Sequence, residues 1–156
     1  MNFRKHIDGD SNLNIIKNHI KKSKIDSFLV GGYVRDLILN RECKDIDIMT
    51  LGEPYNLISE ISKEDGFSDY KIFKNFGTAS INFKTFNYEF VGARKESYSK
   101  TSRNPIVTPG LFEDDMKRRD FTINALAISS NDDYGKLIDS FNGLNDLNNK
   151  IIKTCD

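Results

Sequence analysis

Apolar residues in the first third of the chain follow two different spacings. Leu13, Ile16 and Ile20 recur every three or four residues, which predicts a helix over residues 11–22 with Ser11 as its N-cap. A short apolar run over residues 25–30 stops at a pair of glycines and predicts a buried strand. By the same reasoning, further helices are expected over residues 33–39 and 54–63.

Acidic and apolar residues alternate from Asp45 onwards, which predicts a strand over residues 45–51. Because successive side chains point to opposite faces of a strand, Asp45 and Asp47 should share one face, about 6–7 Å apart. Ile46 and Ile48 should point the other way, into the core.

The second half of the chain predicts mainly strands. A tight hairpin connection is expected at Phe86-Asn87, and the Ser-, Lys- and Pro-containing stretch over residues 96–109 indicates a mobile loop. Together the elements predict an α+β domain around one mixed sheet. The expected strands cover 70–75, 78–85, 88–93, 136–139 and 150–153; the expected helices cover 111–118 and 143–148; and 123–129 is an apolar segment.

Composition narrows the class of protein. The 156 residues are enough for one domain, 38% are hydrophobic, and 23 basic residues balance 23 acidic ones, so no net charge indicates a nucleic-acid partner. Two cysteines cannot form a disulfide framework. The N-terminus has no apolar signal-peptide region, and no apolar run reaches the ~18 residues that span a bilayer, so we expect a cytoplasmic protein without a membrane partner.

The glycine pair Gly31-Gly32 lies where a buried strand leads directly into a helix. Glycines permit close approach of a ligand, and a helix N-terminus favours anions, so this turn is a candidate cradle for a di- or triphosphate. Arg35, one turn into the helix, would add a charged fork to the same anion. The alternative is an ordinary strand–helix turn that needs glycine for its backbone angles.

The pair Asp45 and Asp47 is the candidate metal site. Two neighbouring carboxylates repel each other unless a cation lies between them, and such hard oxygen ligands suit Mg²⁺, which also retains waters and substrate phosphates. The alternative is a solvent-facing acidic edge. A phosphate cradle followed by this acidic strand is a more specific sequence signal than either motif alone. The combination indicates two-metal phosphoryl transfer.

Four segments resemble one known family in order and spacing. GGYVRD, KDIDIM, EDDMKRRDFTINALAI and LIDSFNGLNDLNNKIIKT are similar to the head domain of class II tRNA nucleotidyltransferases. That family includes the CCA-adding enzymes and the related bacterial poly(A) polymerases, within the polymerase-β-like superfamily. The resemblance covers roughly residues 25–153 and implies the polymerase-β-like nucleotidyltransferase fold, with a mixed, mainly antiparallel sheet flanked by helices.

The resemblance also implies roles for individual residues. Gly31, Gly32 and Arg35 would hold the incoming triphosphate, and Asp45 and Asp47 would be catalytic ligands of Mg²⁺. Within RRDFTINA, Arg119, Asp120 and Asn124 would contact the nucleotide, with Asp120 helping to select ribose. Glu89 is a candidate third catalytic carboxylate, which would assist a metal or deprotonate the attacking hydroxyl; its alternative is an exposed strand residue.

The implied reaction is template-independent transfer of CMP or AMP from CTP or ATP to the 3′ end of tRNA. Alternatives are poly(A) synthesis, nucleotidylation of another acceptor, a non-catalytic nucleotide-binding module, and a head fragment that is inactive without its neck. We expect residues 1–24 to be an N-terminal helical extension and 25–156 to be the head, with the family's neck, body and tail absent. The sequence leaves the oligomeric state open.

Overall fold

The computed structural model describes residues 1–156, and its centre is a seven-stranded sheet. Its strands are β1 (Ser27–Val30), β2 (Asp45–Thr50), β3 (Lys71–Phe73), β4 (Thr78–Phe83), β5 (Phe86–Gly92), β8 (Leu126–Ser129) and β9 (Leu137–Asp139). Their order across the sheet is β3-β4-β5-β2-β1-β8-β9. Only β2 and β5 pair in parallel, and all other neighbours are antiparallel. The prediction of a mixed, mainly antiparallel sheet is confirmed.

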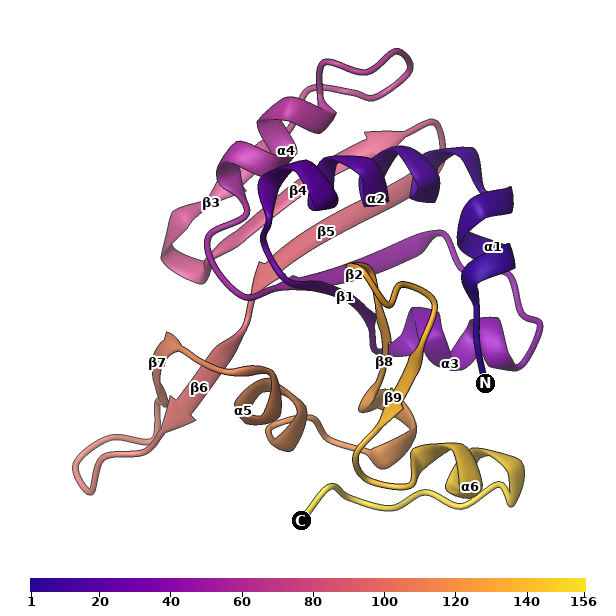
Figure 1. The fold of residues 1–156 in the computed structure, drawn as a ribbon. Coiled ribbons are helices and arrows are strands. Elements are labelled where there is room, and N and C mark those ends of the chain that lie inside the picture. The colour runs from indigo at the N-terminus through magenta and orange to yellow at the C-terminus, as the bar shows by residue number, and fades with distance from the viewer.

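Short helices surround the sheet (Figure 1). The α-helices are α1 (Arg4–Gly9), α2 (Ser11–Ser23), α3 (Gly32–Ile38), α4 (Tyr55–Ile61), α5 (Phe112–Lys117) and α6 (Gly143–Asn148), and two 3₁₀ turns are η1 (Lys74–Phe76) and η2 (Thr122–Asn124). None of these helices combines the length and apolar character that a bilayer span requires.

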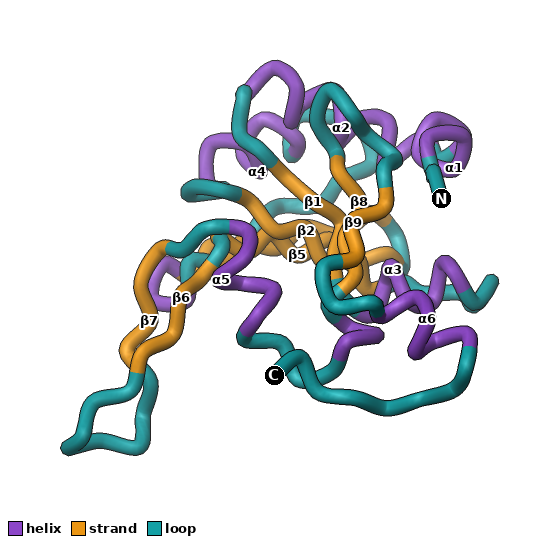
Figure 2. The backbone as a smooth tube through the Cα atoms, turned by 60° about the horizontal axis from the view of Figure 1, so that its bottom comes forward, coloured by secondary structure: helices purple, strands orange, loops and turns teal.

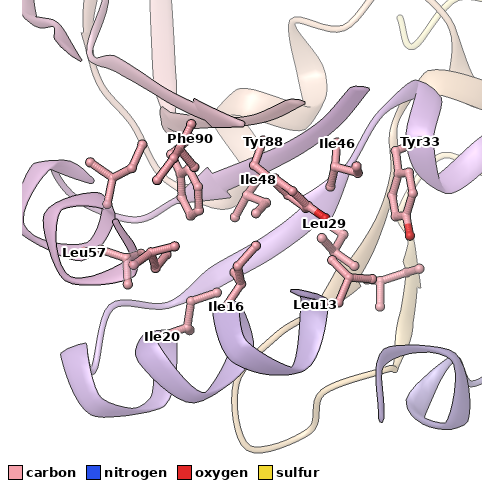
Figure 3. Close-up of a cluster of buried hydrophobic side chains, with 14 of the residues drawn as sticks. Leu13, Ile16, Ile20, Leu29, Tyr33, Ile46, Ile48, Leu57, Tyr88 and Phe90 are labelled. Atoms are coloured by element: carbon pink, nitrogen blue, oxygen red, sulfur yellow. The ribbon is translucent and has the colours of Figure 1, made fainter. Parts of the chain in front are cut away.

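The main hydrophobic core lies between one face of the sheet and the helices α2 and α4 (Figure 3). Helix α2 contributes Leu13, Ile16 and Ile20, which confirms the helical spacing read from the sequence. Ile46 and Ile48 of β2 are 3% and 0% exposed on the same side of the sheet. Their burial leaves the alternate residues of β2 on the opposite face, which is where the candidate chemistry lies.

A second, smaller cluster covers part of that opposite face. It joins Val30, Met49 and Ala127 of the sheet to Ala93 and to Met116 of α5. Helix α5 is thereby fixed beside the strands that carry the acidic residues.

The segment expected to be a mobile loop forms a β-ribbon at its two ends, and only residues 98–105 between the strands lack regular secondary structure. Strands β6 (Arg94–Ser97) and β7 (Ile106–Pro109) pair antiparallel, from Arg94 opposite Pro109 to Ser97 opposite Ile106. The ribbon projects from the body of the molecule with α5 near its base (Figure 2). All four residues of β7 are exposed, so this strand has no alternation of buried and exposed residues that a sequence pattern could reveal.

Three local predictions are wrong. The β4–β5 hairpin turns at Lys84-Thr85, where Lys84 has φ 54°, and not at Phe86-Asn87, because Phe83 already pairs with Phe86. Residues 150–153 form no strand; the Lys153 carbonyl accepts a hydrogen bond from the Thr122 N–H at 2.9 Å, and the next residue, Thr154, forms an isolated bridge with Phe121.

The third wrong prediction concerns the start of helix α2. Its N-cap is Asp10 rather than Ser11. The Asp10 carboxylate accepts hydrogen bonds from the Asn12 and Leu13 N–H groups at 3.0 and 3.1 Å. A capping oxygen satisfies N–H groups that the first helical turn otherwise leaves unpaired.

Candidate functional site

Three acidic residues lie on two neighbouring strands. Asp45 and Asp47 are on β2, and the parallel register places Asp47 opposite Glu89 of β5 and Asp45 opposite Asn87. Asp45 is exposed, whereas Asp47 and Glu89 are half-buried. The structure thus places the strand of Glu89 directly beside that of Asp45 and Asp47, and all three carboxylates share the sheet face opposite the main core.

The pKa of Asp47 is raised from its ordinary 3.8 to about 6. Loss of hydration on burial is the main cause, and the negative charge of Glu89 acts in the same direction. Arg119 partly opposes the rise, and Asp45 adds to it. Burial and the neighbouring carboxylates thus disfavour the ionised form of Asp47, and a cation bound beside it would stabilise that form. The chain has no preformed group of three or more His, Cys, Asp or Glu side chains arranged to hold a metal.

The first glycine of the pair, Gly31, lies beside these carboxylates. Gly31, at the start of α3, has φ 73° and ψ −141°, a conformation that side chains other than glycine rarely adopt. A Cβ atom at Gly31 would lie 3.1 Å from Arg119 Nη1 and 3.8 Å from Asp47 Oδ2. The Gly31 N–H already donates to the Leu126 carbonyl at 3.2 Å. Gly31 therefore provides space at the site rather than a free hydrogen-bond donor.

A second group of polar residues extends from Gly32 along α3. A Cβ atom at Gly32 would lie 3.3 Å from Arg35 Nη2, so the guanidinium lies over this glycine. Arg35 Nη1 donates to Asn124 Oδ1 at 2.8 Å, and Asn124 Nδ2 donates to Asp120 Oδ1 at 3.1 Å. The Arg35 guanidinium also pairs with Asp36 at 2.9 Å. These bonds connect α3 to η2, which lies far away in the sequence.

Asp120 is exposed and its pKa is lowered. The hydrogen bond from the Asn124 side chain is the main cause, followed by one from the Phe121 N–H. Both donors stabilise the ionised carboxylate. Asp120 therefore stays ionised, as a hydrogen-bond acceptor, to a lower pH than an ordinary aspartate.

Sequence reasoning gave no role at the site to Arg94 or Arg118 and also missed Asp115 on α5. Its side chain is 1% exposed and pairs with Arg118 and Arg119, each at 3.1 Å. The spacing of three and four residues on one helix was a signal that could have indicated these pairs. A charged side chain this deeply buried is rare unless it is paired.

A cleft of about 220 Å³ is lined both by the arginines that pair with Asp115 and by the acidic strands β2 and β5. Its charged lining comes from Asp47, Glu89, Arg94, Arg118 and Arg119, together with Asp115. The predicted site residues thus form two groups joined by the glycine turn. The first contains Asp45, Asp47, Glu89, Gly31 and Arg119, and the second contains Gly32, Arg35, Asn124 and Asp120.

Relatives with curated names cover most of this chain. It is 42% identical over 128 residues to an A-adding tRNA nucleotidyltransferase of Aquifex aeolicus, which is 81% of this chain and 15% of that protein. It is 36% identical over 140 residues to a CCA-adding enzyme of Lactobacillus johnsonii, which is 88% of this chain and 33% of that protein. The chain therefore spans a third or less of the length of these relatives.

Solved structures agree with these relatives. An apo form of a CCA-adding enzyme matches all of this chain and 38% of its own, with a TM-score of 0.85 and 29% identity. A tRNA nucleotidyltransferase complexed with a primer tRNA and an incoming ATP analogue matches 90% of this chain and 39% of its own, with a TM-score of 0.78 and 37% identity. The family described as the poly A polymerase head domain matches residues 27–153. The chain belongs to this poly A polymerase head domain family.

Proposed function

We propose that this chain is the catalytic head of a tRNA nucleotidyltransferase, which transfers CMP or AMP from CTP or ATP to the 3′ end of tRNA. The observation that carries the proposal is the placement of Asp47 beside Glu89 and within reach of the Gly31 turn and Arg119. This arrangement puts acidic and basic groups at one cleft, as transfer of a nucleotide from a triphosphate requires. The names of the relatives support the choice of tRNA as acceptor.

Mg²⁺ is the cofactor that we propose, with Asp45 and Asp47 as its protein ligands and Glu89 beside them. The donor set fits, because Mg²⁺ commonly binds one or two carboxylates and completes its shell with waters and substrate phosphates. Glu89, directly opposite Asp47 on β5, adds a further carboxylate whose charge a cation at this point would offset. When bound there, Mg²⁺ would neutralise phosphate charge and lower the pKa of a coordinated hydroxyl.

The remaining residues would bind and orient the nucleotide. Arg35 and Arg119 would hold the triphosphate, with Gly31 and Gly32 allowing close approach of its oxygens. The ionised Asp120 would accept a hydrogen bond from a ribose hydroxyl, with Asn124 holding its carboxylate in place. Glu89 would accept the proton of the attacking hydroxyl or assist a metal.

The division into an extension over residues 1–24 and a head over 25–156 is also a proposal. Helix α2 of the extension packs Leu13, Ile16 and Ile20 into the same core as the sheet. We therefore expect the extension to stabilise the head.

Titration of CTP and ATP into this chain, with and without Mg²⁺, tests the proposal directly. We expect Mg²⁺-dependent binding of both nucleotides with similar affinity, read by calorimetry. No binding of either nucleotide to a sample shown to be folded would contradict a competent triphosphate site and would favour a head that is inactive without its neck. Transfer assays that compare tRNA lacking its CCA end with unstructured RNA distinguish tRNA maturation from poly(A) synthesis.

A further inference from the structure

We propose that Asp115 is a positioning residue that holds Arg119 in place for the triphosphate. The inference rests on the proposed function, because it concerns how the same cleft receives its nucleotide. It assigns a task to a buried carboxylate that does not itself touch substrate, metal or the reacting atoms.

Both oxygens of Asp115 are already occupied. Oδ2 accepts a hydrogen bond from the Arg94 backbone N–H at 2.9 Å and one from Arg118 Nη2 at 3.1 Å. Oδ1 accepts one from Arg119 Nη2 at 3.1 Å. The bond from Arg94 fixes the carboxylate to backbone at the base of the β6–β7 ribbon. The carboxylate can therefore orient the two guanidinium groups and is not available as a metal ligand.

Arg119 depends on this one carboxylate. Its Nε atom is buried without a hydrogen-bond partner, and Asp115 is its only hydrogen-bonded side chain. Arg118 forms a second ion pair, with Glu96 at 3.8 Å, whereas Arg119 forms none with its other acidic neighbour, Asp47. The position of the Arg119 guanidinium is therefore set chiefly by Asp115.

The free side of Arg119 faces the catalytic carboxylates. A Cβ atom placed on Gly31 would lie 3.1 Å from Arg119 Nη1 and 3.8 Å from Asp47 Oδ2, so both groups border the same small space. If Asp115 no longer held the guanidinium, Arg119 could turn towards Asp47, where it would compete with a bound cation. Asp115 thus keeps the positive charge of Arg119 apart from the negative charge of Asp47. The triphosphate can then reach Arg119, and the metal can reach Asp47.

The test compares Asp115→Asn with Glu113→Gln, because Glu113 is an exposed acid on the same helix with no hydrogen-bonded side-chain partner. The Kd of CTP with Mg²⁺ should rise roughly 10- to 100-fold in Asp115→Asn, as expected for loss of one hydrogen bond between charged groups. Glu113→Gln should stay within about twofold of the unsubstituted chain.

A double-substitution cycle separates positioning from a general loss of structure. If Asp115 acts through Arg119, then Asp115→Asn should have little further effect on CTP binding in a chain that already carries Arg119→Gln. Equal losses in both backgrounds would overturn the proposal. Thermal unfolding of every variant checks that each is folded, and Asp115→Glu, which keeps the charge, replaces Asp115→Asn if the latter does not fold.

The guanidinium groups give a readout that needs no nucleotide. We expect a resolved NMR signal from the Arg119 side-chain N–H groups in the unsubstituted chain and in Glu113→Gln. That signal should be averaged or shifted in Asp115→Asn and Asp115→Glu. An Arg119 signal that is unchanged in the Asp115 variants would overturn the positioning role, even if the chain binds no CTP. If the signal changes as expected but the unsubstituted chain binds no CTP, only the proposed function is contradicted.

Discussion

Asp47 and Glu89 face each other across the only parallel strand pair of the sheet. Residues paired in register on neighbouring strands point to the same face, so this pairing brings two carboxylates together from positions 42 residues apart (47 to 89). Like charges directly opposite each other are destabilising. The sheet therefore holds an arrangement that costs stability in the absence of a cation, which is typical of functional sites.

Loss of either aspartate of β2 should abolish transfer. We expect Asp45→Ala and Asp47→Ala in the full-length protein to lower nucleotide incorporation by roughly 10³-fold or more, because a metal contributes several kcal/mol of transition-state stabilisation. The fold should be intact, since both side chains lie outside the main core. Incorporation of labelled nucleotide into tRNA measures the effect.

Glu42→Ala is the matched control for this experiment. Glu42 is an exposed acid just before β2, and its ion pair with Lys44 is long, at 3.8 Å. Its removal should leave incorporation unchanged. Full activity in both aspartate variants would refute the assignment of Asp45 and Asp47 as metal ligands.

Asp47→Asn should stabilise the metal-free protein at neutral pH. The folded-state pKa of Asp47 is about 6, above its ordinary 3.8, so the unfolded state ionises first as the pH rises. Protonated Asp47 therefore contributes to the free energy of unfolding of the unsubstituted chain. This contribution is fully present below pH 3.8 and is lost as the pH rises through about 6. After allowance for solvent screening of this half-buried group, the variant should gain about 1 kcal/mol at pH 7.5.

Urea unfolding in the presence of a chelator checks this prediction at two pH values. The difference between Asp47→Asn and the unsubstituted chain should be present at pH ~7.5 and should shrink towards pH ~4. Equal stability at neutral pH would show that burial and Glu89 do not disfavour the ionised carboxylate.

Gly31→Ala should damage both stability and nucleotide binding. The backbone at Gly31 has φ 73°, and the added Cβ would lie 3.1 Å from Arg119 Nη1. We expect a loss of about 1–3 kcal/mol in the free energy of unfolding, together with weaker binding of CTP because Arg119 is displaced. Gly9→Ala is the control, since no atom lies within 4 Å of its added Cβ. A Gly31→Ala variant as stable as Gly9→Ala would argue against this constraint.

Asp120→Ala should reduce the preference for ribonucleotides. The ionised carboxylate would accept a hydrogen bond from the ribose, and its loss should bring the Kd values of CTP and dCTP about tenfold closer together. Asp132→Ala removes an exposed acid for which no hydrogen-bond partner is seen, and should leave the ratio unchanged. An unaltered ratio in Asp120→Ala would place ribose selection elsewhere.

The acidic strand shows how much the sequence determined by itself. The alternation from Asp45 to Ile48 assigned a face to every one of these residues, and the structure confirms it. The position of the glycine turn between strand and helix was also predicted, because glycine pairs and apolar runs are local signals. Local periodicity decides which face a side chain takes once a strand forms.

Only the tertiary structure decided which distant residues meet. The pairing of Asp47 with Glu89, the link from Arg35 to Asn124 and the burial of Asp115 all join segments that are remote in the sequence. The β6–β7 ribbon was missed because its strands are held by backbone hydrogen bonds and β7 buries no side chain. Long-range backbone pairing depends on how the whole chain packs, and so do the burial of Asp115 and its contact with the Arg94 backbone, so no local pattern could specify them.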